Sequence, residues 1–165
     1  MFLAVLIALA LPAPAAAADD KCEQCLGGTP DSPIQMEIFS DFQCPACRGL
    51  YMETVKPVLR DYASVDKVCV IYHEFPLAMH PLAREAARYS LAAQKLGRLQ
   101  WLAVVDALYT NQAAWSMSGG VQATAAKALS PADFQKVLQL IQDPSINAAI
   151  ERDIALGNKR GVQST

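Results

Sequence analysis

A strand, a helix that begins on a cysteine and a second strand dominate the chain between residues 34 and 74. Apolar and polar residues alternate from 34 to 39, and an apolar run covers 68 to 72, so both segments are predicted to be strands. Apolar residues recur between them at the three- and four-residue steps of one helix face. They are Cys47, Tyr51, Val55, Val58, Leu59 and Tyr62. Strand, helix and strand predict a right-handed βαβ unit, with Pro57 kinking the helix.

The cysteine pair of Cys44-Pro45-Ala46-Cys47 lies where this helix begins. Unpaired backbone N–H groups and the helix dipole favour a thiolate at that position. We therefore expect Cys44 to be the nucleophile, with a lowered pKa. Cys47 lies one turn further along, within reach of a disulfide with Cys44 but less activated. The pattern predicts a reversible dithiol/disulfide.

Residues 1–18 are predicted to be a secretory signal peptide. They hold no charged side chain, and an apolar segment from 2 to 11 precedes an alanine-rich site that fits cleavage before Asp19. No Lys or Arg precedes the apolar segment, which departs from the usual pattern. The net charge of −2 does not suggest a nucleic-acid surface or a basic membrane patch. Five cysteines in an exported chain point to an oxidising compartment.

Residues 19–33 are expected to form a linker that carries a second C-x-x-C, Cys22 and Cys25. We expect these two cysteines to form a local disulfide or an unstructured pair. Exchange of electrons with Cys44 and Cys47 is the alternative. Cys69 lies within the second apolar strand, and we expect it to pack in the core, since free cysteines are among the most buried residues.

A four-cysteine zinc site is the main rival hypothesis for the two pairs. Their spacing, C-x2-C-x18-C-x2-C, falls within the range of such sites. The export signal, the strand between the pairs and the long amphipathic helix after Cys44 argue against it. We therefore expect no metal.

Two motifs resemble the DsbA-like branch of the thioredoxin superfamily. The first is Ser40-Asp41-Phe42-Gln43-Cys44-Pro45-Ala46-Cys47-Arg48, and the second is Phe75-Pro76-Leu77 followed by His80-Pro81. The resemblance implies a thioredoxin-like α/β fold, with its βαβ core at 34–77 and an inserted all-helical domain at 78–160. It also implies exchange of disulfides with protein substrates without a cofactor. Cys44 would attack and Cys47 would resolve the mixed disulfide.

The chain departs from this family at two positions. Strongly oxidising relatives carry a histidine, which stabilises the thiolate, where this chain has Ala46. Many members have a buried acid in the first strand, where this chain has Ile38. A proton shuttle would therefore use Glu37, Asp41, Glu74 or water, and the sequence does not choose among them.

Two histidines follow the second strand. His80 matches a residue of the family motif, and a structural role as the cap of a helix that begins near Pro81 competes with a functional one. His73 is interpreted as a residue at the end of the strand.

Residues 81–160 are predicted to be almost entirely helical. Helices are expected at 81–96, 99–109, 121–129, 131–142 and from 144 to near Gly161, with a loop at 112–120. Ser130 and Asp143, each followed by a proline, mark two helix starts. In the loop, Trp115 and Met117 could line a substrate groove, but core packing is the simpler interpretation.

Residues 161–165 are expected to begin the C-terminal part of the thioredoxin core, beside the C-x-x-C. Because the βαβ unit supplies only two strands, we expect the last strands and the closing helix of the fold to be missing from this sequence.

The sequence thus predicts a periplasmic or otherwise extracytoplasmic thiol–disulfide oxidoreductase. We expect an oxidase that forms disulfides in protein thiols and is re-oxidised by a membrane quinone-linked partner. A disulfide reductase or isomerase of the same fold is the alternative, and a non-catalytic zinc-binding module is the alternative of another class.

Overall fold

The computed structural model describes residues 25–165, and the predicted signal peptide and Cys22 lie outside the described residues. The described residues form one three-stranded sheet, in the order β1-β3-β2. Its strands are β1 (Cys25–Gly27), β2 (Ile34–Ser40) and β3 (Val68–Glu74). β2 and β3 are parallel, with Ile34 opposite Val68 and Ser40 opposite Glu74, whereas β1 runs antiparallel to β3. The predicted βαβ unit is therefore confirmed.

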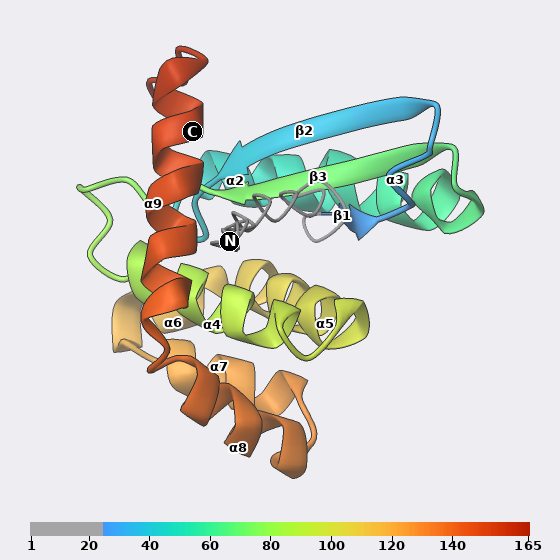
Figure 1. Cartoon of the computed structure of the whole chain (residues 1–165). Coiled ribbons are helices and arrows are strands. Elements are labelled where there is room, and N and C mark those ends of the chain that lie inside the picture. The colour runs from blue at the N-terminus through green and yellow to red at the C-terminus, as the bar shows by residue number, and fades with distance from the viewer. Residues whose placement is uncertain (1–24) are drawn as a thin grey trace, which may run out of the picture.

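The helix between β2 and β3 is built from three segments. They are α2 (Pro45–Leu50), the π-helical η1 (Tyr51–Val55) and α3 (Lys56–Asp61). Pro57 cannot donate a backbone hydrogen bond to the preceding turn, and a π-helical turn lies directly before it. The short 3-10 helix η2 (Ala63–Val65) then leads into β3. Figure 1 shows α2 and α3 running behind the two long strands.

Six further helices follow β3. They are α4 (Ala83–Gln94), α5 (Arg98–Thr110), α6 (Gln112–Ser118), α7 (Val121–Ala128), α8 (Pro131–Leu140) and α9 (Pro144–Lys159). In Figure 1, α4 to α8 gather below the sheet and α9 runs past its end. The expected capping is present, because Asp133 N donates to Ser130 Oγ and Ser145 N donates to Asp143 Oδ1. The prediction of a loop at 112–120 is wrong, since α6 occupies most of it.

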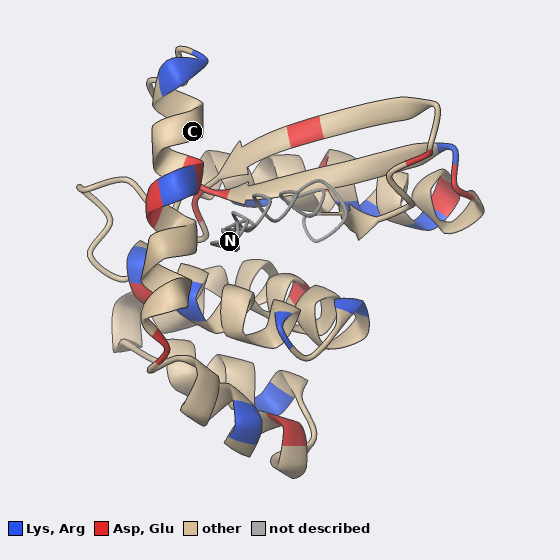
Figure 2. Ribbon diagram, in the orientation of Figure 1, with Lys and Arg blue, Asp and Glu red and all other residues tan. Residues whose placement is uncertain are grey.

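One large core joins the sheet to the helices. Trp101, Trp115, Tyr51, Tyr109 and Phe42 are among its most deeply buried side chains. Charged residues of both signs are interspersed along the helices (Figure 2). Among residues 25–165, no helix is long and apolar enough to cross a membrane.

The edge strand β1 is joined to the central strand by a disulfide between Cys25 and Cys69. Antiparallel pairing places Cys25 opposite Ile71, which brings its sulfur within reach of Cys69. The expectation that Cys69 is a free core cysteine is therefore wrong, as is a disulfide between Cys22 and Cys25. The four-cysteine zinc site is contradicted as well, because the Cys25 sulfur is already bonded. The predicted linker contains a strand of the sheet.

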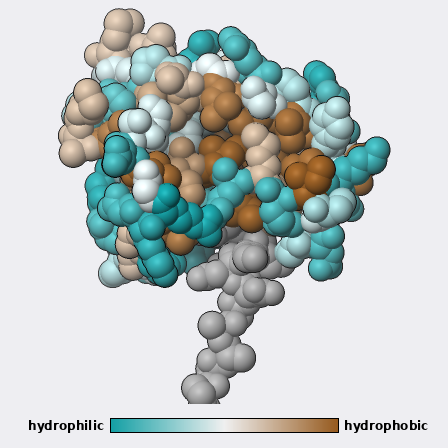
Figure 3. Space-filling view, turned by 90° about the horizontal axis from the view of Figure 1, so that it is seen from above, coloured by the Kyte–Doolittle hydropathy of each residue, from teal (hydrophilic) through white to brown (hydrophobic). Residues whose placement is uncertain are grey.

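β2 forms the other edge of the sheet. Ile34, at its start, has an exposed fraction of 57%. Seen from above, apolar side chains gather at the centre of the face and polar ones surround them (Figure 3).

Candidate active site

Cys44 and Cys47 lie at the start of α2, as the sequence predicts. Cys44 is the residue before the helix, in an extended conformation, and its carbonyl accepts a 3.1 Å hydrogen bond from Arg48 N. Pro45 occupies the first turn, where its missing N–H leaves no bond unmade. Both thiols are reduced and buried. The helix start thus carries one cysteine at its tip and one a turn inside.

The two thiols differ in acidity. Burial opposes ionisation of Cys44, but hydrogen bonds from the backbone of Cys47 and Ala46, together with contacts to Thr165 and the Cys47 thiol, outweigh it and lower the pKa of Cys44. Burial dominates at Cys47 and raises its pKa. Near neutral pH, Cys44 is therefore the better nucleophile of the two.

The last residue of the sequence, Thr165, contacts Cys44. The Cys44 thiol donates to the backbone oxygen of Thr165 over 3.3 Å. Thr165 thus lies against the first cysteine of the C-x-x-C, and residues 161–165 form no strand.

Asp41 holds the turn before α2 in place. Its side chain is fully buried. Oδ1 accepts from Gln43 N at 2.6 Å and from Cys44 N at 3.2 Å. The backbone N–H of Asp41 also points at Cys47 Sγ, 3.4 Å away. One residue therefore contacts both cysteines, through its side chain and its backbone.

The second oxygen of Asp41 connects this turn to the segment after β3. Oδ2 accepts from Leu77 N and from His80 Nδ1, each at 2.8 Å. Beside it, Gln43 Oε1 accepts from Leu82 N at 2.8 Å. The two motifs of the sequence are thus joined by hydrogen bonds. The suggestion that the His80 side chain caps a helix is wrong, because α4 has no side-chain cap and His80 bonds to Asp41.

Gln112 is a site residue that the sequence did not reveal. Its amide nitrogen donates to Phe42 O at 2.7 Å and to Cys44 O at 2.8 Å. Gln112 begins α6, in the segment predicted to be a loop, and no local pattern marks it. It ties the helical part of the chain to the cysteine turn.

Behind Cys47 lies a chain of buried hydroxyl groups. Ser40 Oγ and Tyr109 OH are 2.6 Å apart, and Tyr109 OH and Tyr72 OH are also 2.6 Å apart. The ring of Tyr109 is stacked on Tyr51 and packs against Phe42. Its position is therefore fixed by packing as well as by hydrogen bonds.

The three acids left open as proton shuttles have different surroundings. Asp41 is held by the bonds above, and Glu37 bonds to His73 Nε2 at 2.9 Å and to Arg160. Glu74 is buried, and within residues 25–165 neither of its carboxyl oxygens has a hydrogen bond of good geometry, although the Ser90 hydroxyl lies near it. Burial raises the pKa of Glu74 well above its ordinary value.

His73, interpreted from sequence as a strand-end residue, lies near the end of β3 and is buried. Its Nδ1 bonds to Asp153 of α9 at 2.8 Å, while Nε2 bonds to Glu37 of β2. Adjacent strand residues point to opposite faces, so His73 faces away from Tyr72 and the hydroxyl chain. It links β2, β3 and α9.

A model of the thioredoxin family matches residues 20–165. The chain belongs to the thioredoxin family. No curated protein matches it significantly. Among solved structures, DsbA of Chlamydia trachomatis aligns with a TM-score of 0.71 and 14% identity, covering 94% of this chain and 84% of that one. BdbD of Bacillus subtilis aligns at 0.71 with 20% identity, covering 87% and 78% respectively.

The thiol–disulfide exchange protein alpha-DsbA2 of Wolbachia pipientis gives a TM-score of 0.69 at 20% identity, over 84% of this chain and 71% of that one. This member of the thioredoxin family therefore has the DsbA-like fold, with helices inserted after the βαβ unit. The predicted fold is confirmed. Elements beyond Thr165 stay a prediction.

A cleft of about 780 Å³ lies between the segment after β3 and α9. The segment after β3, including Phe75, Leu77 and His80, lines one side, while α9 and residues 161–163 line the other. His80 and Leu77, which line this cleft, also donate hydrogen bonds to Asp41 in the turn before Cys44. Trp115, suggested as a groove residue, is buried, whereas Met117 is 86% exposed and does not pack in the core.

Proposed function

We propose that this chain is a thiol–disulfide oxidoreductase that exchanges disulfides with protein substrates through Cys44 and Cys47, and that it runs as an oxidase. The observation that carries this proposal is the difference between the two thiols: Cys44 caps a helix start and has a lowered pKa, while Cys47 is buried with a raised pKa.

A stabilised Cys44 thiolate favours the reduced form of the pair and makes the disulfide form a stronger oxidant. The helix start supplies this stabilisation here, because hydrogen bonds from the Cys47 and Ala46 backbones lower the pKa of Cys44. This stabilisation of the Cys44 thiolate is present although Ala46 replaces the histidine of the strongly oxidising relatives.

The reaction takes two exchange steps. A substrate thiolate attacks Cys44 Sγ in the Cys44–Cys47 disulfide, which forms a mixed disulfide and releases Cys47 as a thiolate. A second substrate thiolate then attacks the substrate sulfur of the mixed disulfide and releases Cys44 as a thiolate. The substrate gains one disulfide and the enzyme becomes a dithiol, so two electrons have passed to the enzyme.

The proposal includes an extracytoplasmic, periplasmic location and a membrane quinone-linked partner that re-oxidises the dithiol. The Cys25–Cys69 disulfide supports the location, because structural disulfides persist in oxidising compartments. The apolar leader at 1–18 supports it as well. The cleft between the segment after β3 and α9 would hold the substrate polypeptide.

The test is the reduction potential of the Cys44–Cys47 pair, measured by equilibration with glutathione in a Cys22→Ser variant that removes the remaining thiol. We expect a value well above that of thioredoxin, towards about −120 mV. A value near −270 mV, typical of thioredoxin, would reject the oxidase and favour a reductase. Absence of any exchange with glutathione would reject the whole proposal.

A further inference from the structure

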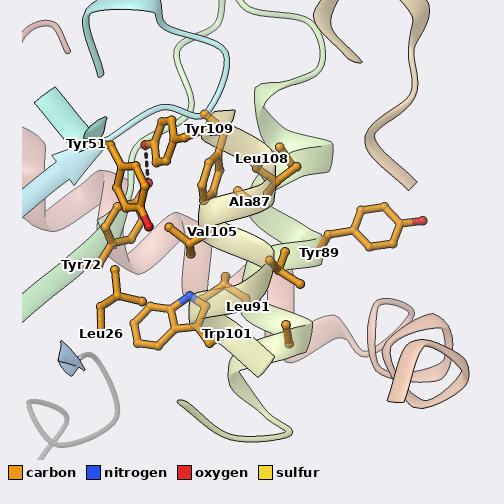
Figure 4. Packing of buried hydrophobic residues seen from close by; sticks show 14 of the residues in the cluster. Leu26, Tyr51, Tyr72, Ala87, Tyr89, Leu91, Trp101, Val105, Leu108 and Tyr109 are labelled. Atoms are coloured by element: carbon orange, nitrogen blue, oxygen red, sulfur yellow. Dashed lines mark hydrogen bonds between the residues drawn. The ribbon is translucent and has the colours of Figure 1, made fainter. Parts of the chain in front are cut away.

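The hydroxyl chain behind Cys47 has one hydrogen more than its internal bonds need. Its three hydroxyl groups belong to Ser40, Tyr109 and Tyr72, and two hydrogen bonds join them. Figure 4 shows the rings of Tyr72 and Tyr109 with a dashed line between their hydroxyl oxygens. Each hydroxyl can donate one hydrogen bond and accept others. The spare hydrogen can therefore lie at Ser40, at Tyr72 or, when both neighbours donate to it, at Tyr109.

One end of the chain lies at Cys47. Ser40 directly precedes Asp41, whose N–H points at Cys47 Sγ. The Ser40 side chain lies near enough to Cys47 to lower the pKa of that thiol against the larger effect of burial. The Ser40 hydroxyl is thus placed to accept from a Cys47 thiol or to donate to a Cys47 thiolate.

The other end of the chain lies on the same face of the sheet as Glu74. Tyr72 and Glu74 are two residues apart on β3, and Ser40 is opposite Glu74 on β2. The Glu74 carboxyl group lies near enough to raise the pKa of Tyr72 by its charge, without a hydrogen bond to that hydroxyl. The pKa of both tyrosines is raised well above its ordinary value, chiefly by burial, so their hydroxyls keep their hydrogens.

We infer that the Ser40 hydroxyl, backed by Tyr109 and Tyr72, is a reversible hydrogen-bond partner of the Cys47 sulfur that stabilises its thiolate whenever the Cys44–Cys47 disulfide opens. This inference rests on the proposed function. It makes Ser40 a positioning residue for disulfide exchange and gives a role to a tyrosine from the helical insertion.

The exchange reaction places charge on Cys47 in both directions. When a substrate thiolate attacks Cys44, the bond to Cys47 breaks and Cys47 leaves as a thiolate. In the reverse direction, the Cys47 thiolate attacks Cys44 Sγ of the mixed disulfide, and the substrate leaves as a thiolate that takes up the proton Cys47 lost. A leaving thiol with a lower pKa leaves faster. The Ser40 hydroxyl therefore assists a step that burial alone would slow.

Other groups near Cys47 also affect its charge. They are the Cys44 thiol just before α2, Asp41 just after β2, Thr165 at the chain end and Tyr109 on α5. Glu74 on β3 acts on Tyr109. The negative charge of Cys44 raises the pKa of Cys47. The experiment therefore removes Cys44, so that the contribution of the hydroxyl can be measured without it.

The decisive experiment measures the pKa of Cys47 by ultraviolet thiolate absorbance, in the full chain carrying Cys22→Ser and Cys44→Ala. Adding Ser40→Ala should raise this pKa by about one to two units, since a hydrogen bond to a charged group is lost. Ser32→Ala is the matched control, a buried serine before β2 that accepts from Thr29 N at 3.1 Å, and it should leave the pKa unchanged.

Two further variants keep the test valid if Ser40→Ala does not fold. Ser40→Thr keeps the hydroxyl group, and Ser40→Val has the shape of that threonine without the hydroxyl group. Only the valine variant should therefore show the raised pKa of Cys47. With Cys44 restored, the valine variant should also react several-fold more slowly than the threonine variant when the oxidised protein is mixed with dithiothreitol.

The outcomes separate this inference from the proposed function. If the wild-type disulfide does not react with dithiothreitol or glutathione, the proposed function is wrong. If it reacts and the threonine and valine variants have the same Cys47 pKa, the hydroxyl chain has no part in the exchange and the inference is overturned.

Discussion

Removing the Cys25–Cys69 disulfide should cost this protein a large part of its stability. The bond joins residues 44 positions apart and ties the edge strand β1 to the central strand. A cross-link of that span removes loop-closure entropy from the unfolded chain, and the chain-entropy relation gives about 4 kcal/mol at room temperature. Typical domains have only about 5 to 15 kcal/mol in total. The double variant Cys25→Ala and Cys69→Ala should therefore be close to unfolding.

Urea unfolding, followed by circular dichroism on the oxidised protein, measures this loss. The midpoint should fall, and the slope with denaturant should rise because the unfolded chain becomes less compact. Cys22→Ser is the matched control, and it should leave both unchanged. A loss below about 1 kcal/mol for the double variant would refute the reasoning. So would an equal loss for Cys22→Ser, since that would make Cys22 a member of the stabilising bond.

Three other predictions concern the cysteine turn. Cys44→Ser should abolish exchange with a model dithiol substrate, whereas Cys47→Ala should accumulate mixed disulfides that mass spectrometry detects; full activity of the serine variant would contradict the assignment. Asp41→Asn should cost about 1.5 to 3 kcal/mol in urea unfolding and slow alkylation of Cys44, because an amide group cannot accept at both ends. The matched change at an exposed position, Asp31→Asn, should do neither. Because the pKa of Cys44 is lowered on folding, the reduced protein should gain stability as pH rises from that lowered value towards 9.0 and lose it as pH falls through the lowered value. Unfolding of reduced Cys44→Ser, which cannot ionise there, should lack this rise.

Helix starts show which features can be predicted from the residues next to each other in the sequence. Ser130 and Asp143 were predicted to begin helices, and both cap α8 and α9 as expected. A cap depends on the capping side chain and on the backbone of the next turn, all within a few residues. α6 shows the limit, because it was predicted to be a loop. This short helix is stabilised by the burial of Trp115 and by the hydrogen bonds of Gln112 to Phe42 and Cys44, which are far away in the sequence. The composition of the helix does not predict these contacts.

The cysteines show the same contrast. The place of Cys44 at a helix start follows from periodicity and a proline, so the sequence located the reactive pair. Cys69 was expected to be unpaired, although an odd cysteine inside a strand is itself a signal that a partner exists. Choosing that partner required the antiparallel pairing of β1 with β3.

The sequence alone determined the βαβ unit, the helix that starts on Cys44 and the DsbA-like arrangement of two motifs. Those features depend on residue patterns whose spacing repeats within one strand or one helical turn. Only the tertiary structure decided that Cys25 pairs with Cys69, that His80 bonds to Asp41, and that Tyr109 shares a hydrogen bond with Ser40. The physical reason is that each of these contacts joins side chains of separate elements, and packing of the whole core fixes their distance and direction.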